Sequence, residues 1–237
     1  MNKTITWLAP DGDREWFPPL DQVLDEPEGL LAAGGDLSIS RLLAAYRRGI
    51  FPWYSAGQPV LWWSPNPREV LVPAEFRCSR SLSKTLRNRG FGVTFDGDFA
   101  AVVDACAARR EHSPGTWITP EMRAAYCALH AQGHAHSVEV RLDGALVGGL
   151  YGVLLGQVFF GESMFSGERD ASKVALARLA ERAVVAGIQL IDCQLPTPHL
   201  RSLGSKPMPR HEFSALVSRY TAGADMPLFR HPENCSP

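Results

Sequence analysis

The chain has 237 residues, 45% of them hydrophobic, and its 24 basic and 25 acidic side chains leave a net charge of -1. This length and composition suit a globular protein of one or two domains, and they exclude a disordered chain. The balanced charge excludes a global positive field for nucleic acid, so any RNA-binding surface has to be local.

The sequence carries neither a recognisable secretion signal nor a candidate membrane span. The N-terminal segment lacks the apolar core of a signal peptide, and no stretch reaches the ~20 apolar residues that cross a bilayer. The five cysteines are scattered and form no Cys-x-x-Cys pair, which favours reduced thiols. We therefore expect a cytoplasmic protein without membrane contact.

The N-terminal part is rich in turn-forming segments such as Ser64-Pro-Asn-Pro67. Only one helix pattern is clear there. It begins after Asp36 or Ser38, either of which can cap the first turn, and it ends at Gly49. We predict a small, irregular N-terminal domain over residues 1–68.

From Val70 onward, helix and strand patterns alternate along the chain. Alternating apolar residues around Val138 predict a strand, and Asp143-Gly144 reverses the chain into a second strand over residues 145–154. A third strand is expected over residues 157–161. Apolar spacing predicts helices over residues 79–88, 98–110, 120–132, 171–186 and 209–220.

The helix over residues 171–186 precedes one more predicted strand, over residues 189–193. Three antiparallel strands, a long helix and a further strand imply a meander followed by a crossover onto a neighbouring strand. This α/β (α+β) arrangement suits an acetyltransferase-like (GNAT-like) C-terminal domain over residues 69–237.

Polar residues close two of these strands. Glu162 follows the strand over residues 157–161, and Asp192 and Gln194 end the strand that follows the long helix. Strand alternation places Asp192 and Gln194 on one face, opposite Ile191 and Cys193. A buried carboxylate is costly unless it is paired or used, so the pattern predicts either a polar site at a sheet opening or two residues that only cap a strand end.

Apolar residues flank Glu162 on both sides in the sequence. Leu150, Phe159 and Met164 are candidates for an apolar pocket, where a flexible Met can adapt to guests of different shape. Ordinary core packing is the alternative.

Tryptophans gather in the turn-rich segments, at Trp53, Trp62, Trp63 and Trp117. Exposed indole rings can stack on the bases of a single-stranded nucleic acid. Packing of one domain on the other is the alternative, and Trp53 and Trp117 are the better candidates for stacking.

A local basic excess lies in the first predicted helix of the C-terminal part. Arg80, Lys84 and Arg87 share one helical face, and no acidic residue interrupts the segment. The segment is either a strip of phosphate contacts or a solvated surface helix.

Six short motifs, taken together and in order, resemble the bacterial leucyl/phenylalanyl-tRNA–protein transferase family, and the resemblance runs from about residue 17 to about residue 220. They are Phe51-Pro-Trp-Tyr54, Leu61-Trp-Trp-Ser-Pro65, Gly115-Thr-Trp-Ile-Thr119, Gly161-Glu-Ser-Met-Phe-Ser166, Ile191-Asp-Cys-Gln194 and His199-Leu-Arg-Ser-Leu-Gly204.

The resemblance assigns roles to the candidate residues. It implies that Glu162, Asp192 and Gln194 line the catalytic centre and that an apolar pocket formed by Leu150, Phe159 and Met164 receives the aminoacyl side chain. It also implies that Trp53 and Trp117 contact the terminal adenosine of tRNA. Arg80, Lys84 and Arg87 would then contact the phosphates of the acceptor stem.

The implied reaction moves Leu or Phe, and less well Met, from aminoacyl-tRNA to the α-amine of proteins that start with Arg or Lys. The product carries a degradation signal of the N-end rule pathway. Because the ester of Leu-tRNA or Phe-tRNA is already activated, we expect no metal and no cofactor. We expect a monomer.

Two other readings compete with this one. A CoA-dependent N-acetyltransferase would need a glycine-rich loop to hold pyrophosphate, whereas the loop before the long helix carries Asp170 and lacks a glycine repeat. A non-catalytic RNA-binding module would leave Glu162 and Gln194 without a purpose. Two departures from the family pattern are Leu150, where Met is familiar, and a stiff segment, Leu195-Pro-Thr-Pro198.

Overall fold

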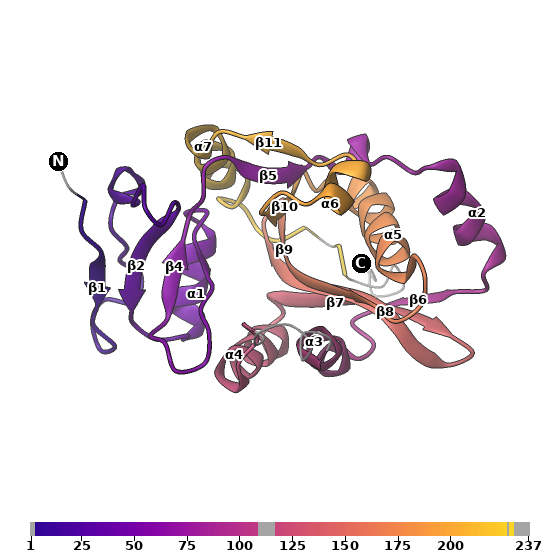
Figure 1. Ribbon diagram of the computed structural model, residues 1–237, viewed down its shortest axis with the longest axis horizontal. Helices are drawn as coiled ribbons and strands as arrows, with labels where there is room; N and C mark the ends of the chain where they lie inside the picture. The colour runs from indigo at the N-terminus through magenta and orange to yellow at the C-terminus, as the bar shows by residue number, and fades with distance from the viewer. Residues whose placement is uncertain (1–2, 109–116, 227, 230–237) are drawn as a thin grey trace, which may run out of the picture.

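The computed structural model describes residues 3–108, 117–226 and 228–229, and it contains two β-sheets (Figure 1). The smaller sheet has four strands in the order β1-β2-β4-β3, and the larger has seven in the order β11-β5-β10-β9-β8-β7-β6. The fold is therefore mixed α/β, which confirms the predicted class.

The N-terminal part is more regular than its sequence indicates. Its sheet consists of β1 (Thr6–Leu8), β2 (Leu30–Gly34), β3 (Phe51–Pro52) and β4 (Leu61–Trp63), with α1 (Ile39–Tyr46) and a short 3-10 helix, Leu20–Gln22. Strands of two to five residues are too short to give a visible alternation of apolar and polar residues. Trp62 is fully buried, and its indole nitrogen donates to the carbonyl of Gly34 over 2.9 Å.

The larger sheet contains the predicted meander and crossover. β7 (Ala135–Leu142), β8 (Ala145–Leu155) and β9 (Val158–Ser166) are antiparallel neighbours. After α5 (Ala171–Ala186), β10 (Leu190–Gln194) pairs in parallel with β9. Asp143 and Gly144 both have positive φ, as a tight turn between twisted strands requires.

The edges of the larger sheet come from segments distant in sequence. β5 (Arg68–Leu71) pairs antiparallel with β10, and β11 (Lys206–Met208) pairs antiparallel with β5. At the opposite edge, β6 (Gly92–Phe95) pairs with β7. β5 begins at Arg68, the last residue of the predicted N-terminal domain, and the boundary at that residue stays a prediction.

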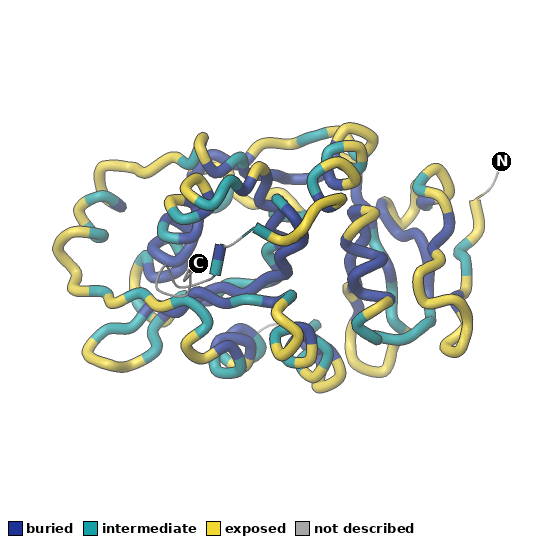
Figure 2. The backbone as a smooth tube through the Cα atoms, turned by 180° about the vertical axis from the view of Figure 1, so that it is seen from behind, coloured by how far each residue is buried: buried dark blue, intermediate teal, exposed yellow. Residues whose placement is uncertain are grey.

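Helices cover both faces of this sheet (Figure 1). α5 packs on one face, with α2 (Arg80–Asn88) against it, while α3 (Phe99–Ala108) and α4 (Pro120–Ala131) cover the other face. Figure 2 shows the central strands largely buried and the segment around α2 largely exposed. The remaining helices are the 3-10 helix Pro73–Glu75, α6 (Pro198–Ser202) and α7 (Arg210–Tyr220).

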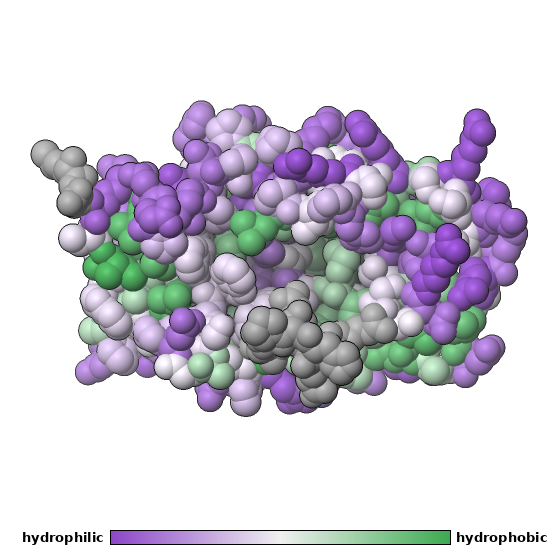
Figure 3. Space-filling model, in the orientation of Figure 1, coloured by the Kyte–Doolittle hydropathy of each residue, from purple (hydrophilic) through white to green (hydrophobic). Residues whose placement is uncertain are grey.

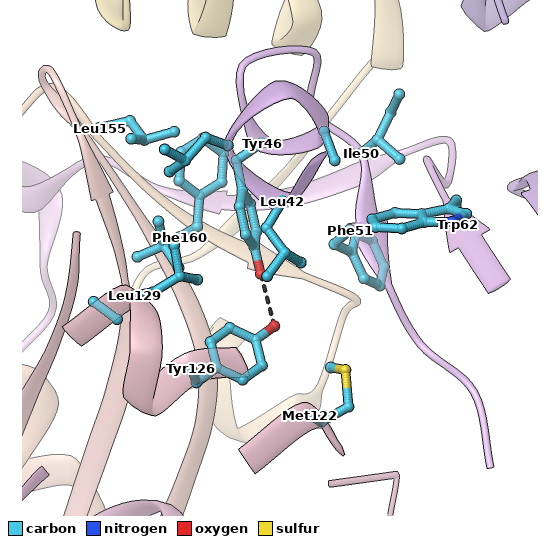
Figure 4. Close-up of a cluster of buried hydrophobic side chains, with 14 of the residues drawn as sticks. Leu42, Tyr46, Ile50, Phe51, Trp62, Met122, Tyr126, Leu129, Leu155 and Phe160 are labelled. Carbon is cyan, nitrogen blue, oxygen red and sulfur yellow. Dashed lines mark hydrogen bonds between the residues drawn. The ribbon is translucent and has the colours of Figure 1, made fainter. Parts of the chain in front are cut away.

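One hydrophobic core joins the N-terminal part to the larger sheet. Leu42 and Tyr46 of α1 belong to the same buried cluster as Tyr126 of α4 and Phe160 of β9. Figure 4 shows the rings of Tyr46 and Tyr126 pointing toward one another across this junction. This junction lies next to the point where β9 and β10 part, so both parts of the chain contribute side chains around that point.

Candidate active site

The site lies where two parallel strands part. β9 and β10 pair at three positions, ending with Phe160 opposite Asp192, and β9 then continues to Ser166 without β10. The strand was predicted to end at Gly161; it instead carries a β-bulge, because Gly161 faces Gly152 while Ser163 faces Tyr151. Glu162 is therefore the extra residue of a bulge, a local distortion that re-aims a side chain next to the opening.

Glu162 is held by two phenols and one amide. Tyr46 donates to Oε1 over 2.8 Å, Tyr126 donates to Oε2 over 2.6 Å, and Gln194 Nε2 donates to Oε1 over 3.3 Å. Burial raises the pKa of Glu162 to about 7, the phenol hydrogen bonds act in the opposite direction, and Asp192 and Arg68 have opposing influences. Its carboxyl group can therefore exchange a proton near neutral pH.

Asp192 is locked in a buried ion pair. Arg68 Nε lies 2.8 Å from Oδ1 and Nη2 lies 2.6 Å from Oδ2, and both side chains are at most 1% exposed. The guanidinium lies between the rings of Phe51 and Phe213, 4.6 and 4.7 Å from their centroids. This bidentate pair occupies both carboxylate oxygens of Asp192, so Asp192 is a holding group rather than a free base.

Asp192 in turn fixes Gln194. The backbone N–H of Gln194 donates to Asp192 Oδ1 over 2.9 Å, and Gln194 has φ of 57°, an uncommon conformation for a residue with a side chain. The register with β5 also shifts between these two residues. The expected alternation therefore fails at the strand end, and Ile191 and Cys193 line the same cavity as Asp192 and Gln194.

The opening contains a cavity of about 340 Å³. Its polar edge includes Glu162, Gln194, Ser163 and His199, and burial together with Lys173 lowers the pKa of His199. Figure 3 shows the surface hollowed near the centre of the face drawn. The apolar wall consists largely of the three residues expected for the aminoacyl pocket and three others that were not predicted to line it: Leu150, Phe159, Met164, Leu176, Leu179 and Ile191.

Three residues around the polar groups were not anticipated from the sequence. Tyr46 and Tyr126 fit helical apolar patterns, and Arg68 begins a short strand after a proline-rich turn. No local signal distinguishes them, because each meets its partner across a long sequence separation.

The two motifs predicted to contact the terminal adenosine meet each other. The hydroxyls of Tyr54 and Thr119 lie 3.3 Å apart, which joins the motif of Trp53 to that of Trp117. Trp53 is 42% exposed and packs edge-on against Trp63, whereas Trp117 is half-buried against the core. Gly115 and Thr116 of the second motif lie outside the described residues.

The predicted basic strip lies on α2, at the end of the molecule farthest from the N-terminal sheet (Figure 1). Arg80, Lys84 and Arg87 are all exposed, and Leu82 anchors the helix on its buried side. In Figure 3 the upper part of this end of the molecule is largely hydrophilic, whereas hydrophobic residues gather below it. The neighbouring Arg89 forms an ion pair with Glu168 over 2.9 Å.

The start of α5 is closed by its own chain. Asp170 adopts a left-handed conformation, and its carboxylate pairs with Lys173 over 2.8 Å instead of capping the helix. Ser166 Oγ accepts from the N–H of Ser172, and the carbonyl of Glu168 accepts from that of Ala171. This arrangement disfavours a pyrophosphate at the helix start, because amides are engaged and an anionic side chain lies beside them.

The described residues contain no group of three or more His, Cys, Asp and Glu side chains arranged to hold a metal ion. His136 instead contacts Asp96 and stacks on Phe229, while His130 stacks on Phe99. None of the helices in the described part of the chain is long and apolar enough to cross a membrane.

Two solved structures that partly resemble this chain are FemX and an N-acetyltransferase. FemX gives a TM-score of 0.48 at 11% identity, covering 76% of this chain and 71% of that chain. A GCN5-related N-acetyltransferase from Kribbella flavida gives 0.39 at 14% identity, covering 70% of this chain and 60% of that chain.

Comparison of the sequence with known families identifies the family of this chain. The family model for leucyl/phenylalanyl-tRNA protein transferase matches residues 70–218, and the model for the N-terminal domain of that family matches residues 35–66. A leucyl/phenylalanyl-tRNA–protein transferase of Azotobacter vinelandii is 63% identical, over 84% of this chain and 88% of that protein. One from Pseudomonas entomophila is 57% identical, over 91% of this chain and 95% of that protein. The chain belongs to the leucyl/phenylalanyl-tRNA–protein transferase family and is an aminoacyltransferase.

Proposed function

We propose that the protein transfers Leu or Phe, and less well Met, from aminoacyl-tRNA to the α-amine of proteins that begin with Arg or Lys. The product would enter the N-end rule pathway of degradation, and the enzyme would act as a cytoplasmic monomer. The observation that carries this proposal is an apolar cavity whose rim holds a carboxyl group and an amide, Glu162 and Gln194, within hydrogen-bond distance of each other.

Positioning supplies much of the proposed catalysis. An aminoacyl ester is already activated, and alignment of amine and carbonyl is worth up to about 7 to 11 kcal/mol. Gln194 Nε2 is directed at Glu162, which leaves its Oε1 to accept a hydrogen bond from the incoming amine. Asp192 acts through the backbone of Gln194, which it holds with Oδ1.

The apolar cavity accounts for the choice of amino acid. Leu150, Phe159 and Met164 would contact the aminoacyl side chain, and Leu176, Leu179 and Ile191 complete the wall. A missing methylene in such a pocket is worth only about 1 to 3 kcal/mol, so some use of Met is expected.

The donor tRNA would lie across both parts of the chain. The terminal adenosine would stack near Trp53 and Trp117, whose motifs meet at Tyr54 and Thr119. The acceptor stem would contact the basic strip of Arg80, Lys84 and Arg87 on α2.

The acceptor's positive charge would be met by Glu162. Two carboxyl groups of the described residues line the cavity. Asp192 is already paired with Arg68, whereas the hydrogen-bond partners of Glu162 are two phenols and an amide, none of which is a cation. An ammonium or a basic side chain of the acceptor would complement it.

A transfer assay tests this function directly. The enzyme is supplied with Leu-tRNA or Phe-tRNA and with peptides that differ only in their first residue, and the products are weighed by mass spectrometry. Extension by one Leu or Phe of peptides that start with Arg or Lys is expected. Extension regardless of the first residue would contradict the acceptor specificity, and acetylation from acetyl-CoA in place of aminoacylation would contradict the function.

A further inference from the structure

Three oxygen-bearing groups form a closed triangle beside the cavity. Tyr126 Oη lies 2.6 Å from Glu162 Oε2, Tyr46 Oη lies 2.8 Å from Glu162 Oε1, and the two phenol oxygens lie 2.7 Å apart. The groups come from α4, α1 and β9, and all three side chains are buried. Figure 4 shows the two phenols directed at each other from the two helices.

The number of protons decides how many of these contacts are hydrogen bonds. With Glu162 ionised, the two phenols supply two protons, both of which go to carboxylate oxygens, and the 2.7 Å contact between the phenols holds no proton. With Glu162 protonated, each group donates one hydrogen bond and accepts one, so all three contacts are satisfied. The short contact between the phenols therefore fits the protonated acid, in which one of the two phenols accepts a hydrogen bond from Glu162 and donates to the other phenol.

We propose that Glu162, Tyr46 and Tyr126 form a proton-storing ring that takes up the proton which the acceptor's α-ammonium must lose before it can attack. This proposal rests on the transferase function proposed above. Glu162 is the group that faces the acceptor, and Tyr46 and Tyr126 are positioning residues that act through it.

The charged surroundings allow the ring to exist in both states. From β10, Asp192 faces the ring with its charge matched by Arg68 of β5, and Gln194 donates to Glu162. From β8, Tyr151 packs edge-on against Tyr126. A free α-amine has a pKa of about 7.7 to 8.0, within about one unit of the pKa of about 7 of Glu162, so proton transfer between them is nearly balanced.

The α-ammonium gives one proton to ionised Glu162, and the ring gains its third hydrogen bond. The amine nitrogen then forms the new C–N bond, the ester C–O bond breaks, and the ribose oxygen leaves with the second N–H proton. Glu162 releases the stored proton to solvent before the next cycle. The products are an amide, a tRNA with a free ribose hydroxyl, and one proton.

Titration of the substrate-free protein tests the ring independently of transfer. The matched variant is Glu162→Gln, because an amide donates from nitrogen and accepts at oxygen and so reproduces the protonated ring without titrating. Tyrosines are labelled with carbon-13 at Cζ, and their resonances are assigned with Tyr46→Phe and Tyr126→Phe.

The ring predicts that both tyrosine resonances of the wild type shift together around pH 7. In Glu162→Gln the same resonances should show no transition around pH 7 and should stay close to the low-pH wild-type values over that range. Tyrosine resonances that do not change with pH, or that change only in the ordinary pH range of a Glu side chain, would overturn the proposal.

Stability gives a second readout. Because the pKa of Glu162 is raised from 4.5 to about 7 on folding, its contribution is present at low pH and is lost as pH rises through the folded value. Between about pH 5 and about pH 8, the folding constant of the wild type should fall roughly 70-fold relative to Glu162→Gln. A ratio that stays constant over this range would contradict a stored proton.

The role of the ring in transfer is tested by measuring the rate of single-turnover transfer at saturating substrates as a function of pH. At about pH 7 the wild type should outpace Glu162→Gln, and the ratio of the two rates should fall as pH rises above about 8, because a growing fraction of the amine is already free. A ratio independent of pH would overturn the role in proton uptake even where the ring titrates. Absence of transfer in the wild type would instead count against the proposed function and leave the titration result standing.

Discussion

Replacement of Arg68 by Met should unfold the protein at a much lower temperature and abolish transfer. Met roughly preserves the apolar volume between Phe51 and Phe213 but removes the bidentate partner of Asp192. An uncompensated buried carboxylate destabilises by about 3 to 5 kcal/mol. For a chain of this size each kcal/mol shifts the melting temperature by about 2 to 4 °C, so a drop of about 6 to 20 °C is expected.

Two further variants separate the loss of the Arg68–Asp192 ion pair from a general loss of stability. Arg178→Met breaks an exposed ion pair with Glu181 and should shift the melting temperature by no more than about 2 °C. The double variant Arg68→Met/Asp192→Leu removes both buried charges and should recover most of the stability. It should still fail to transfer, because the N–H of Gln194 loses its acceptor.

Thermal unfolding and single-turnover transfer are measured side by side on the three variants and the wild type. The proposed role of the Arg68–Asp192 ion pair is refuted if Arg68→Met has a melting temperature close to that of Arg178→Met and transfers at the wild-type rate. Recovery of transfer in the double variant would show that Asp192 does not act by holding Gln194.

Variants of Gln194, of Leu150 and of the basic strip on α2 test the remaining parts of the site. Gln194→Ala should slow single-turnover transfer by about 100-fold while tRNA affinity stays close to that of the wild type, and unchanged turnover would contradict the role of Gln194 as hydrogen-bond acceptor for the amine. Leu150→Phe narrows a cavity of about 340 Å³ and should lower transfer of Phe about 10-fold more than transfer of Leu, whereas Val185→Phe on the exposed face of α5 should leave the preference unchanged. An equal loss of both amino acids would place the side chain elsewhere. Lys84→Ala/Arg87→Ala should reduce the salt dependence of tRNA binding by about two in log–log slope, and an unaltered slope would refute contact with this strip.

The sequence predicts most of the C-terminal fold because its elements are long and periodic. α5 was predicted at its observed bounds, and the order of meander, helix and parallel strand follows from the same pattern. The N-terminal sheet escaped prediction because β3 has only two residues and β1 and β4 three each. Such strands gain their stability from pairing with distant strands, which a local pattern does not report.

The polar groups of the site were also predicted only in part from the sequence. The convergence of Glu162, Asp192 and Gln194 was anticipated from two expected strand ends, although β9 in fact continues past Glu162 to Ser166. The bulge at Glu162 and the left-handed Gln194 could not, because both arise from the register between strands. Arg68 lies 124 positions from Asp192 and Tyr46 lies 116 from Glu162, so only the folded chain brings them together.

A structure of the enzyme with a non-hydrolysable phenylalanyl-adenosine analogue would show directly where the aminoacyl group binds. We expect the phenyl ring among Leu150, Phe159 and Met164, the carbonyl beside Gln194 and Glu162, and the adenine near Trp53. A phenyl ring bound outside this cavity would contradict the assignment of the site at the opening between β9 and β10.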